Sequence, residues 1–420
     1  MAQKSKQWAA IIMMIALFAM IAFVTNLCSP MATIVKNQFG ASELAGQIGN
    51  YANFIAYLVM GIPSGMLIAK LGYKKTALLA LIVGIVGIVF EYLSGVVGSY
   101  VIYLVGAFIS GLCMCMLNTV VNPLLNVLGG GGKTGNQLIQ IGGAANSAAA
   151  VAVYILMGAL IGEVTKSTGI SDATPALIIA GVIFVIAFVI LLFTKIEEPE
   201  QAKVELSLIT GALKFRQLSL GALAIFLYMS VEVGTPTYMI SYLQTPEVGL
   251  SAGVAGLIAS VYWLMMFVGR SIGGSIGGKV SSRAMVSTVA TAAIALLLFG
   301  IFAPETMKVT VIGIDWGNLE VIYPQVPVCV LAFILVGLCT SVMWGGIFNM
   351  AVEGLGKYTA AASGIFMTMV FGCAVMVGLQ AWVADLVGYL YSYFIPVACA
   401  GYILFYALVG SKVKKVDTPE

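Results

Sequence analysis

Glu232 stands near the middle of a long apolar segment, where a charged side chain is costly and usually has a functional role. Burial without a neighbouring cation favours the protonated form of a carboxyl group. Glu232 could therefore bind and release a proton, or coordinate a cation such as Na+. Two other roles remain open: it could accept hydrogen bonds from the hydroxyl groups of a cargo, or bond to another helix of the protein.

Neutral polar and aromatic residues occur in the same kind of apolar surroundings. Asn118 and Asn122 are four residues apart, so they share one face of a helix. Amides that donate and accept hydrogen bonds, together with flat aromatic faces, suit a polyhydroxylated ring. The alternative is that the amides only join neighbouring helices, as they often do in membranes. The candidate binding residues are Asn26, Asn118, Asn122, Gln140, Asn146, Glu232, Trp263, Trp344 and Asn349.

Two prolines mark corresponding places in the chain. Asn26 precedes Pro30 by four residues, and Glu232 precedes Pro236 by four. Proline lacks an N–H and clashes with the carbonyl four residues earlier, so both sites are expected to have freed carbonyls. Transporters form cargo and ion sites at broken helices in matching positions of two repeats. The pattern predicts such a site, with two ordinary proline kinks as the alternative.

The elements that must hold these residues are membrane helices. Hydrophobic residues make up 61% of the chain and charged residues only 9%, with a mean hydropathy of +1.05. One crossing of a bilayer takes about 20 apolar residues. The first run lacks a cleavage signal and is expected to remain as a helix. Twelve apolar runs predict an all-α membrane protein, near residues 9–28, 48–69, 77–95, 101–128, 137–162, 174–195, 216–243, 250–274, 284–303, 325–350, 361–384 and 389–411.

The basic residues predict the orientation of these spans. Of the 20 Lys and Arg residues, 17 fall on the side of the two termini, with Arg270 counted at the end of its span. The other side has only Lys36, Lys166 and Lys308. Since positive charge is enriched in cytoplasmic loops, both termini are expected in the cytoplasm. Glu91 and Asp385 lie near the outer ends of spans and are expected to be solvated.

A weak internal repeat predicts two pseudo-symmetric halves. Gly61 to Gly65 after the second span resembles Gly269 to Gly273 after the eighth, at an offset of 208 residues. A polar stretch with several glutamates follows the sixth span. The expected organisation is an N-terminal six-helix bundle at 1–195, a cytoplasmic linker at 196–215 and a C-terminal six-helix bundle at 216–420.

Several function classes find no support in the sequence. Histidine is absent, and there is neither a paired-acid motif nor a set of metal ligands, so neither an enzyme nor a metal site is expected. The net charge of +3 is too small to indicate nucleic-acid binding. The run Gly129 to Thr134 lacks the first glycine of a phosphate-binding loop, because residue 127 is valine. No cofactor is expected apart from a coupling ion, H+ or Na+.

Two ordered motifs carry a resemblance to a known family. They are Ile62–Gly65 leading to Leu71–Lys74, and Leu117–Pro123 leading to Val127–Gly129. Asn146-Ser147, Gly269-Arg270 and Gly346 to Phe348 support them. Over nearly its whole length the chain resembles the fucose:proton symporter family, also called the glucose/galactose transporter family, of the major facilitator superfamily.

The resemblance implies two six-helix bundles and import of a hexose, deoxyhexose or amino sugar by alternating access, coupled to H+ or Na+. The expected setting is the inner membrane of a bacterium, and the expected state is a monomer. The chain departs from the family in two places: Ser29 and Asn118 replace carboxylates of spans 1 and 4. Either Glu232 carries the coupling alone, or the protein is an uncoupled sugar facilitator, or its substrate differs. An exporter of lipophilic compounds is a further alternative.

Overall fold

The described part of the chain contains twelve helices of membrane-spanning length and hydropathy, as predicted. The computed structural model describes residues 7–40, 46, 48–129, 132–161, 168–196, 198, 206–276, 280–355 and 358–413. The six spans of the first half are α1 (Trp8–Phe39), α3 (Ile48–Leu71), α4 (Tyr73–Val97), α5 (Tyr100–Leu128), α6 (Gly132–Ile161) and α7 (Thr174–Phe193). A short 3₁₀ turn, Ile170–Ala173, leads into α7.

Several spans of the second half are divided into shorter helices. The continuous spans there are α11 (Ala252–Ile276) and α12 (Ser282–Phe302). The divided spans are α9 (Arg216–Met229) with α10 (Thr235–Leu243), α13 (Cys329–Thr340) with α14 (Met343–Val352), α15 (Thr359–Met369) with α16 (Gly372–Val387), and α17 (Tyr389–Ser392) with α18 (Phe394–Phe405) and a π-helical turn, Tyr406–Gly410.

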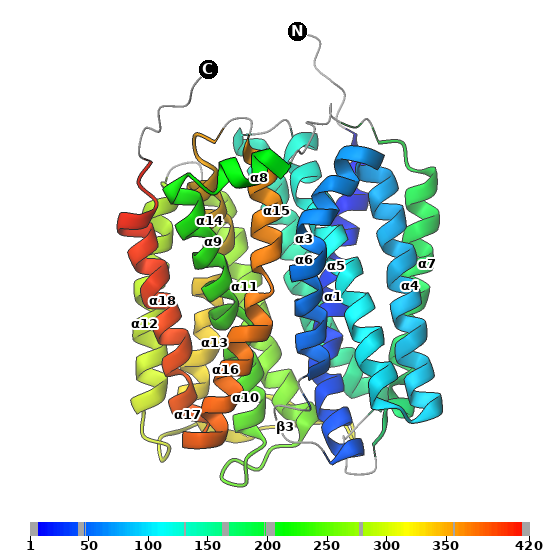
Figure 1. The fold of residues 1–420 in the computed structure, drawn as a ribbon. Helices are drawn as coiled ribbons and strands as arrows, with labels where there is room; N and C mark the ends of the chain where they lie inside the picture. The colour runs from blue at the N-terminus through cyan, green and yellow to red at the C-terminus, as the bar shows by residue number, and fades with distance from the viewer. Residues whose placement is uncertain are drawn as a thin grey trace.

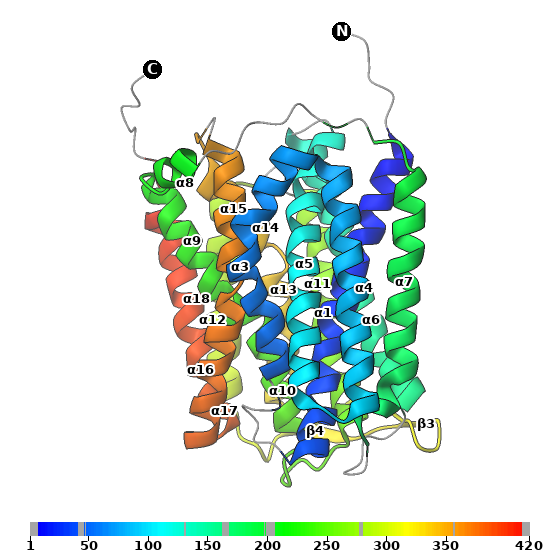
Figure 2. The same cartoon turned by 45° about the vertical axis from the view of Figure 1, so that its right-hand side comes forward.

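The two halves form two six-helix bundles that lie side by side, which confirms the predicted fold class (Figure 1). The short helix α8 (Leu206–Ala212) lies on the segment that joins them. Across the interface α3 packs against α15, and the two run next to each other in Figure 2. Helix α6 packs in the same way against α11. These two pairs of helices border the space in which a cargo site must lie.

The face opposite the start of α1 carries two small antiparallel strand pairs, which are the outer and inner parts of one nested hairpin (Figure 1). Strand β1 (Lys308–Thr310) pairs antiparallel with β4 (Gln325–Pro327), and β2 (Gly313–Asp315) pairs antiparallel with β3 (Glu320–Ile322). From the sequence this stretch is only a long loop between spans. Its four strands therefore add an ordered cover on what we call the outer face.

The helix around Glu232 is irregular, as Pro236 predicts, but it is continuous and not broken. A π-helical segment, Ser230–Gly234, separates α9 from α10 just before Pro236. Such segments often mark functional sites, because they leave backbone groups outside the regular ladder. The Tyr262 hydroxyl donates to the carbonyl of Val231 at 3.2 Å. The hydroxyls of Thr237 and Tyr393 donate to the carbonyls of Val233 and Thr235, respectively. Helix α1 passes through Pro30 as a regular α-helix, so the matching interruption expected there is not found.

Glu91 is buried, so the expectation that it is solvated is wrong. Its side chain is 5% exposed, and the Ser110 hydroxyl donates to its carboxylate at 2.8 Å. Helices α4 and α5 approach closely here, because a side chain at Gly87 or Gly106 would overlap Ser110 or Glu91. The other acid of the pair, Asp385, is exposed as predicted.

Close packing inside the N-terminal bundle predicts a matched pair of glycine variants. A Cβ at Gly111 in α5 would overlap the carbonyl oxygen of Asn53 and lie 2.8 Å from the Cβ of Ala56 in α3. Gly111→Ala is therefore expected to destabilise the protein by about 1–3 kcal/mol through overpacking. Gly65→Ala meets no atom within 4 Å and should be neutral or slightly stabilising. Thermal unfolding in detergent compares the two, and equal midpoints would contradict this packing.

Candidate functional site

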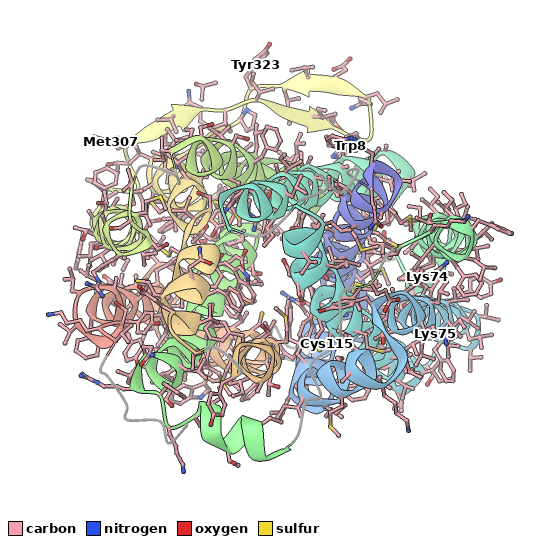
Figure 3. The ribbon with its side chains drawn as sticks, turned by 90° about the horizontal axis from the view of Figure 1, so that it is seen from above. Trp8, Lys74, Lys75, Cys115, Met307 and Tyr323 are labelled. Carbon is pink, nitrogen blue, oxygen red and sulfur yellow. The ribbon has the colours of Figure 1, made fainter. Side chains whose placement is uncertain are left out.

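A cavity of about 140 Å³ lies between the two bundles. This volume is well above the roughly 15 Å³ that a single water requires. Both halves contribute to its wall. Figure 3 shows the two halves facing each other in the view along the helices. Seven of the nine residues predicted from the sequence line it: Asn26, Asn118, Asn122, Asn146, Glu232, Trp263 and Trp344.

Glu232 faces a cation, which the sequence did not indicate. Its Oε1 lies 3.7 Å from Nη2 of Arg270, and the side chains are only 14% and 12% exposed. Arg270 was counted among the residues at the cytoplasmic end of its span, and that placement is wrong. It lies within α11 and lines the cavity, and its side chain has partners in both bundles. Glu232 is therefore a paired carboxylate and not an isolated one.

Arg270 also connects the C-terminal bundle to the N-terminal one. Its Nη1 donates to the carbonyl of Gly143 at 2.6 Å and to the Ser147 hydroxyl at 2.8 Å, both in α6. The amide oxygen of Asn146 lies at 3.5 Å from the same nitrogen. A guanidinium group has five N–H donors in a fixed plane, which suits it to several partners at once. This contact joins the two halves at the level of the cavity.

Asparagines form the polar wall of the N-terminal bundle. The Asn118 amide donates to the Tyr57 hydroxyl at 2.9 Å, and that of Asn122 donates to the Asn118 carbonyl at 3.0 Å. The Asn26 and Asn146 amides donate to backbone carbonyls of α1, at 2.8 and 2.9 Å. An amide has two N–H donors and an acceptor oxygen. These bonds therefore hold the side chains in place and leave other groups of each amide able to form hydrogen bonds. The wall is thus fixed in place and still able to bind.

Aromatic rings form the facing wall. Trp344 packs beside Tyr228, with ring centroids 6.1 Å apart, and Trp263 packs edge-on against Tyr262 at 5.5 Å. The Tyr262 hydroxyl in turn lies 2.9 Å from that of Thr340. These neighbours restrain both indoles, so the C-terminal side offers flat apolar surfaces opposite the amides. A ring with hydroxyl groups around its edge would find both kinds of contact.

Two of the nine predicted residues lie away from the cavity. Gln140 packs against Gly274 and Gly345 at the interface of the bundles, nearer the end where α6 begins. It is six residues from Asn146 and so on a different face of α6, as expected from the spacing. Asn349 is exposed on α14, five residues and more than a full turn beyond Trp344. Helical spacing therefore separates both residues from the site.

The cavity wall also contains three polar residues that are absent from the predicted set, Arg270, Tyr57 and Thr25, and eight apolar residues. One signal for Arg270 exists: it is seven residues after Trp263, which places the two on the same helix face. The side chain of Ser29, where the family has a carboxylate, lies outside the described residues. Within the part of the chain that the structure describes, no group of three or more His, Cys, Asp or Glu residues could hold a metal ion.

Comparisons with known proteins agree with this architecture. The sequence profile of the Major Facilitator Superfamily matches residues 13–379. A glucose/galactose transporter of Brucella abortus is 26% identical over 403 residues, covering 94% of this chain and 92% of the relative. The L-fucose-proton symporter of Escherichia coli is 22% identical over 424 residues, with the same coverage.

Solved structures show the same fold. The fucose:proton symporter FucP in its outward conformation matches with a TM-score of 0.74 at 20% identity, covering 96% of this chain and 99% of FucP. A D-xylose-proton symporter matches with a TM-score of 0.72 at 13% identity, covering 98% of this chain and all of that structure. The profile match spans most of the sequence, and the twelve helices form the corresponding two bundles. The chain therefore belongs to the major facilitator superfamily.

Proposed function

We propose that the protein imports a sugar by alternating access, with Glu232 coupling import to H+ or Na+. The observation that carries the proposal is the cavity itself, where asparagines of one bundle face two tryptophans and an ion pair of the other. A polyhydroxylated ring needs both hydrogen-bonding groups and flat apolar surfaces. The relatives named for glucose, galactose and fucose support a hexose or deoxyhexose.

Closed contacts on the outer face support inward access in this conformation. The Tyr51 hydroxyl of α3 lies 3.3 Å from the Tyr238 hydroxyl of α10, which joins the bundles near the hairpin. The ring of Tyr154 in α6 packs against Gly256 of α11 on the same side. In alternating access these contacts separate as the two bundles rock about the cavity, and the cargo then enters from outside.

The pair of Glu232 and Arg270 suggests how an ion could be coupled to this movement. With Glu232 ionised, Arg270 is shared between a carboxylate of its own bundle and acceptors on α6. A proton or sodium ion on Glu232 removes or offsets the negative charge beside Arg270. Binding of an ion therefore changes a contact that spans the interface, which biases one arrangement of the bundles over another.

We further propose that both termini lie in the cytoplasm and that the protein works as a monomer in a bacterial inner membrane. Helix α1 begins, and the last helix ends, at one face, with the hairpin at the other (Figure 1). The basic residues cluster near the first of these faces, as expected for the cytoplasmic side. Exposed apolar side chains of α7, including Ile178, Val182, Ile186 and Phe193, suit contact with lipid.

Uptake of labelled D-glucose, D-galactose and L-fucose into proteoliposomes tests the proposal, with and without an inward proton gradient and then a sodium gradient. Accumulation of one sugar above its outside concentration under a gradient is the expected result. Equal uptake with and without either gradient would instead indicate an uncoupled facilitator. Failure to move any sugar, combined with extrusion of a lipophilic dye, would contradict sugar transport and favour the exporter.

Asn118→Ala is expected to weaken sugar binding. The change removes an amide from the cavity wall together with its bond to Tyr57. One lost hydrogen bond corresponds to about 0.5–1.5 kcal/mol, so the dissociation constant should rise by roughly twofold to tenfold. Asn349→Ala is the matched control, because Asn349 is exposed and does not line the cavity. Binding of the transported sugar by calorimetry compares them; equal affinities would exclude Asn118 from the site.

A further inference from the structure

Trp316 occupies the tip of the hairpin formed by β2 and β3. Next to it, Asp315 accepts hydrogen bonds from the side-chain amide of Asn318 and the backbone N–H of Gly317, both at 2.9 Å. These bonds favour the ionised carboxylate and keep the pKa of Asp315 below its usual value. They form a tight turn that fixes the tip. The turn therefore presents Trp316 in a defined position on the outer face.

The indole of Trp316 lies against both bundles. A Cβ at Gly253 in α11 would come within 2.6 Å of its Cδ1, and one at Gly158 in α6 would overlap its Cε2. Glycine at these two positions lets the ring rest directly on the backbone of a helix from each half. The strands run along one edge of the molecule, from the labelled Met307 past Tyr323 (Figure 3).

Packing below the indole is incomplete. A small cavity of about 40 Å³ lies between the bundles and is lined by Gly158 and Gly253 together with Pro30, Thr33 and Tyr154. Side chains that border a void lose attractive contacts on that side. Beside this cavity, the rings of Trp316 and Tyr154 contact glycines of α6 and α11 and so contribute to the contact between these helices near the outer face.

We propose that Trp316 is a latch that holds the outer side closed and shifts the protein towards the conformation closed to the outside. The inference rests on the alternating access of the proposed function. Opening the outer side requires α6 and α11 to separate, and an indole that contacts both must then leave at least one. Removing the ring stabilises the outward-open conformation relative to the closed one, with no change in the cargo cavity.

Cysteine accessibility measures this equilibrium without any cargo. All seven native cysteines are buried, so Thr33→Cys supplies a reporter on the outer side, beside the small cavity. A membrane-impermeant maleimide is applied to right-side-out vesicles. Adding Trp316→Ala is expected to raise the labelling rate by about tenfold, as suits loss of a buried aromatic contact. Tyr323→Ala is the matched control, because Tyr323 lies in the same loop and is 66% exposed.

A second reporter distinguishes a shift of the conformational equilibrium from local shielding of the outer cysteine by the indole. Gln140→Cys lies at the bundle interface on the inner side and is labelled in inside-out vesicles. If Trp316 biases the equilibrium, Trp316→Ala lowers this rate while it raises the outer one. An unchanged outer rate would overturn the proposal, and so would a raised outer rate with an unchanged inner rate.

Glycine variants test the same contact without altering the indole. Gly253→Ala displaces the ring and should reproduce both shifts, whereas Gly401→Ala, which meets no atom within 4 Å, should reproduce neither. Since no sugar is present in these assays, a failure of the proposed sugar transport can be distinguished from a failure of the proposed role of Trp316. If both rates shift but no sugar is carried, the latch stands and the proposed cargo is wrong.

Discussion

Replacing Arg270 with alanine is expected to abolish sugar uptake. Arg270 is the cation that pairs with Glu232, and its Nη1 binds Gly143 and Ser147 of the opposite bundle. Removing one partner of a buried ion pair costs about 3–5 kcal/mol, because the remaining charge is left without compensation. Uptake should fall to the background rate, because the variant also loses the contact through which an ion on Glu232 would act on α6. Initial rates of labelled sugar uptake into proteoliposomes measure the loss.

Arg270→Lys tests whether charge alone suffices. A lysine ammonium keeps the charge but lacks the planar set of donors that reaches Glu232 and α6 together. It should recover the fold, monitored by thermal unfolding, and little of the transport. The double variant Arg270→Ala with Glu232→Gln should unfold at a higher temperature than Arg270→Ala, because it no longer leaves a charge unpaired. Full transport by Arg270→Lys would show that the contact with α6 of the N-terminal bundle does not require a guanidinium group.

Sequence reasoning located the fold and most of the polar and tryptophan side chains of the cavity wall for a clear physical reason. A membrane span must satisfy its backbone internally and present apolar side chains to lipid, so hydropathy records each crossing. Polar residues inside such a span stand out individually. That is how Glu232 and the asparagines of α5 were found, and the π-helical segment at Glu232 follows from Pro236.

Contacts between distant spans could not be predicted in the same way. Arg270 lies near the end of its apolar run, where a basic residue normally reaches the cytoplasm, and only the packing of α11 against α6 turns it inward. Glu91 was misplaced for a related reason. Its burial depends on the close approach that Gly87 and Gly106 allow between α4 and α5. One sequence shows where spans lie but not which faces meet.

The hairpin with Trp316 had no signal in the hydropathy pattern, because its two strands, β2 and β3, are only three residues long. Its position follows from pairing within the loop and from two glycines on helices far apart in sequence. Glycines at a helix interface look the same in a sequence as glycines that face lipid. The contact of Trp316 with both bundles on the outer face can therefore be recognised only in the three-dimensional structure.

Glu232→Gln is expected to retain sugar exchange and to lose uphill accumulation. Glutamine has nearly the shape of glutamate, and its amide oxygen can still accept a hydrogen bond from Arg270, so the cavity should keep its form. It cannot take up a proton or bind a sodium ion as a carboxylate does. Under the same imposed gradient, the inside-to-outside sugar ratio should fall to about one, since a carrier without coupling only equilibrates its cargo.

Counterflow separates the two activities in one preparation. Vesicles loaded with unlabelled sugar should exchange it for labelled sugar equally well in Glu232→Gln and the parent, while gradient-driven accumulation distinguishes them. Asp385→Asn makes the same chemical change at an exposed position and should alter neither measurement. If Glu232→Gln still accumulates sugar, another acid carries the coupling ion. Glu91, buried beside Ser110, would be the next residue to replace, because it is another acid buried within a span in the described part of the chain.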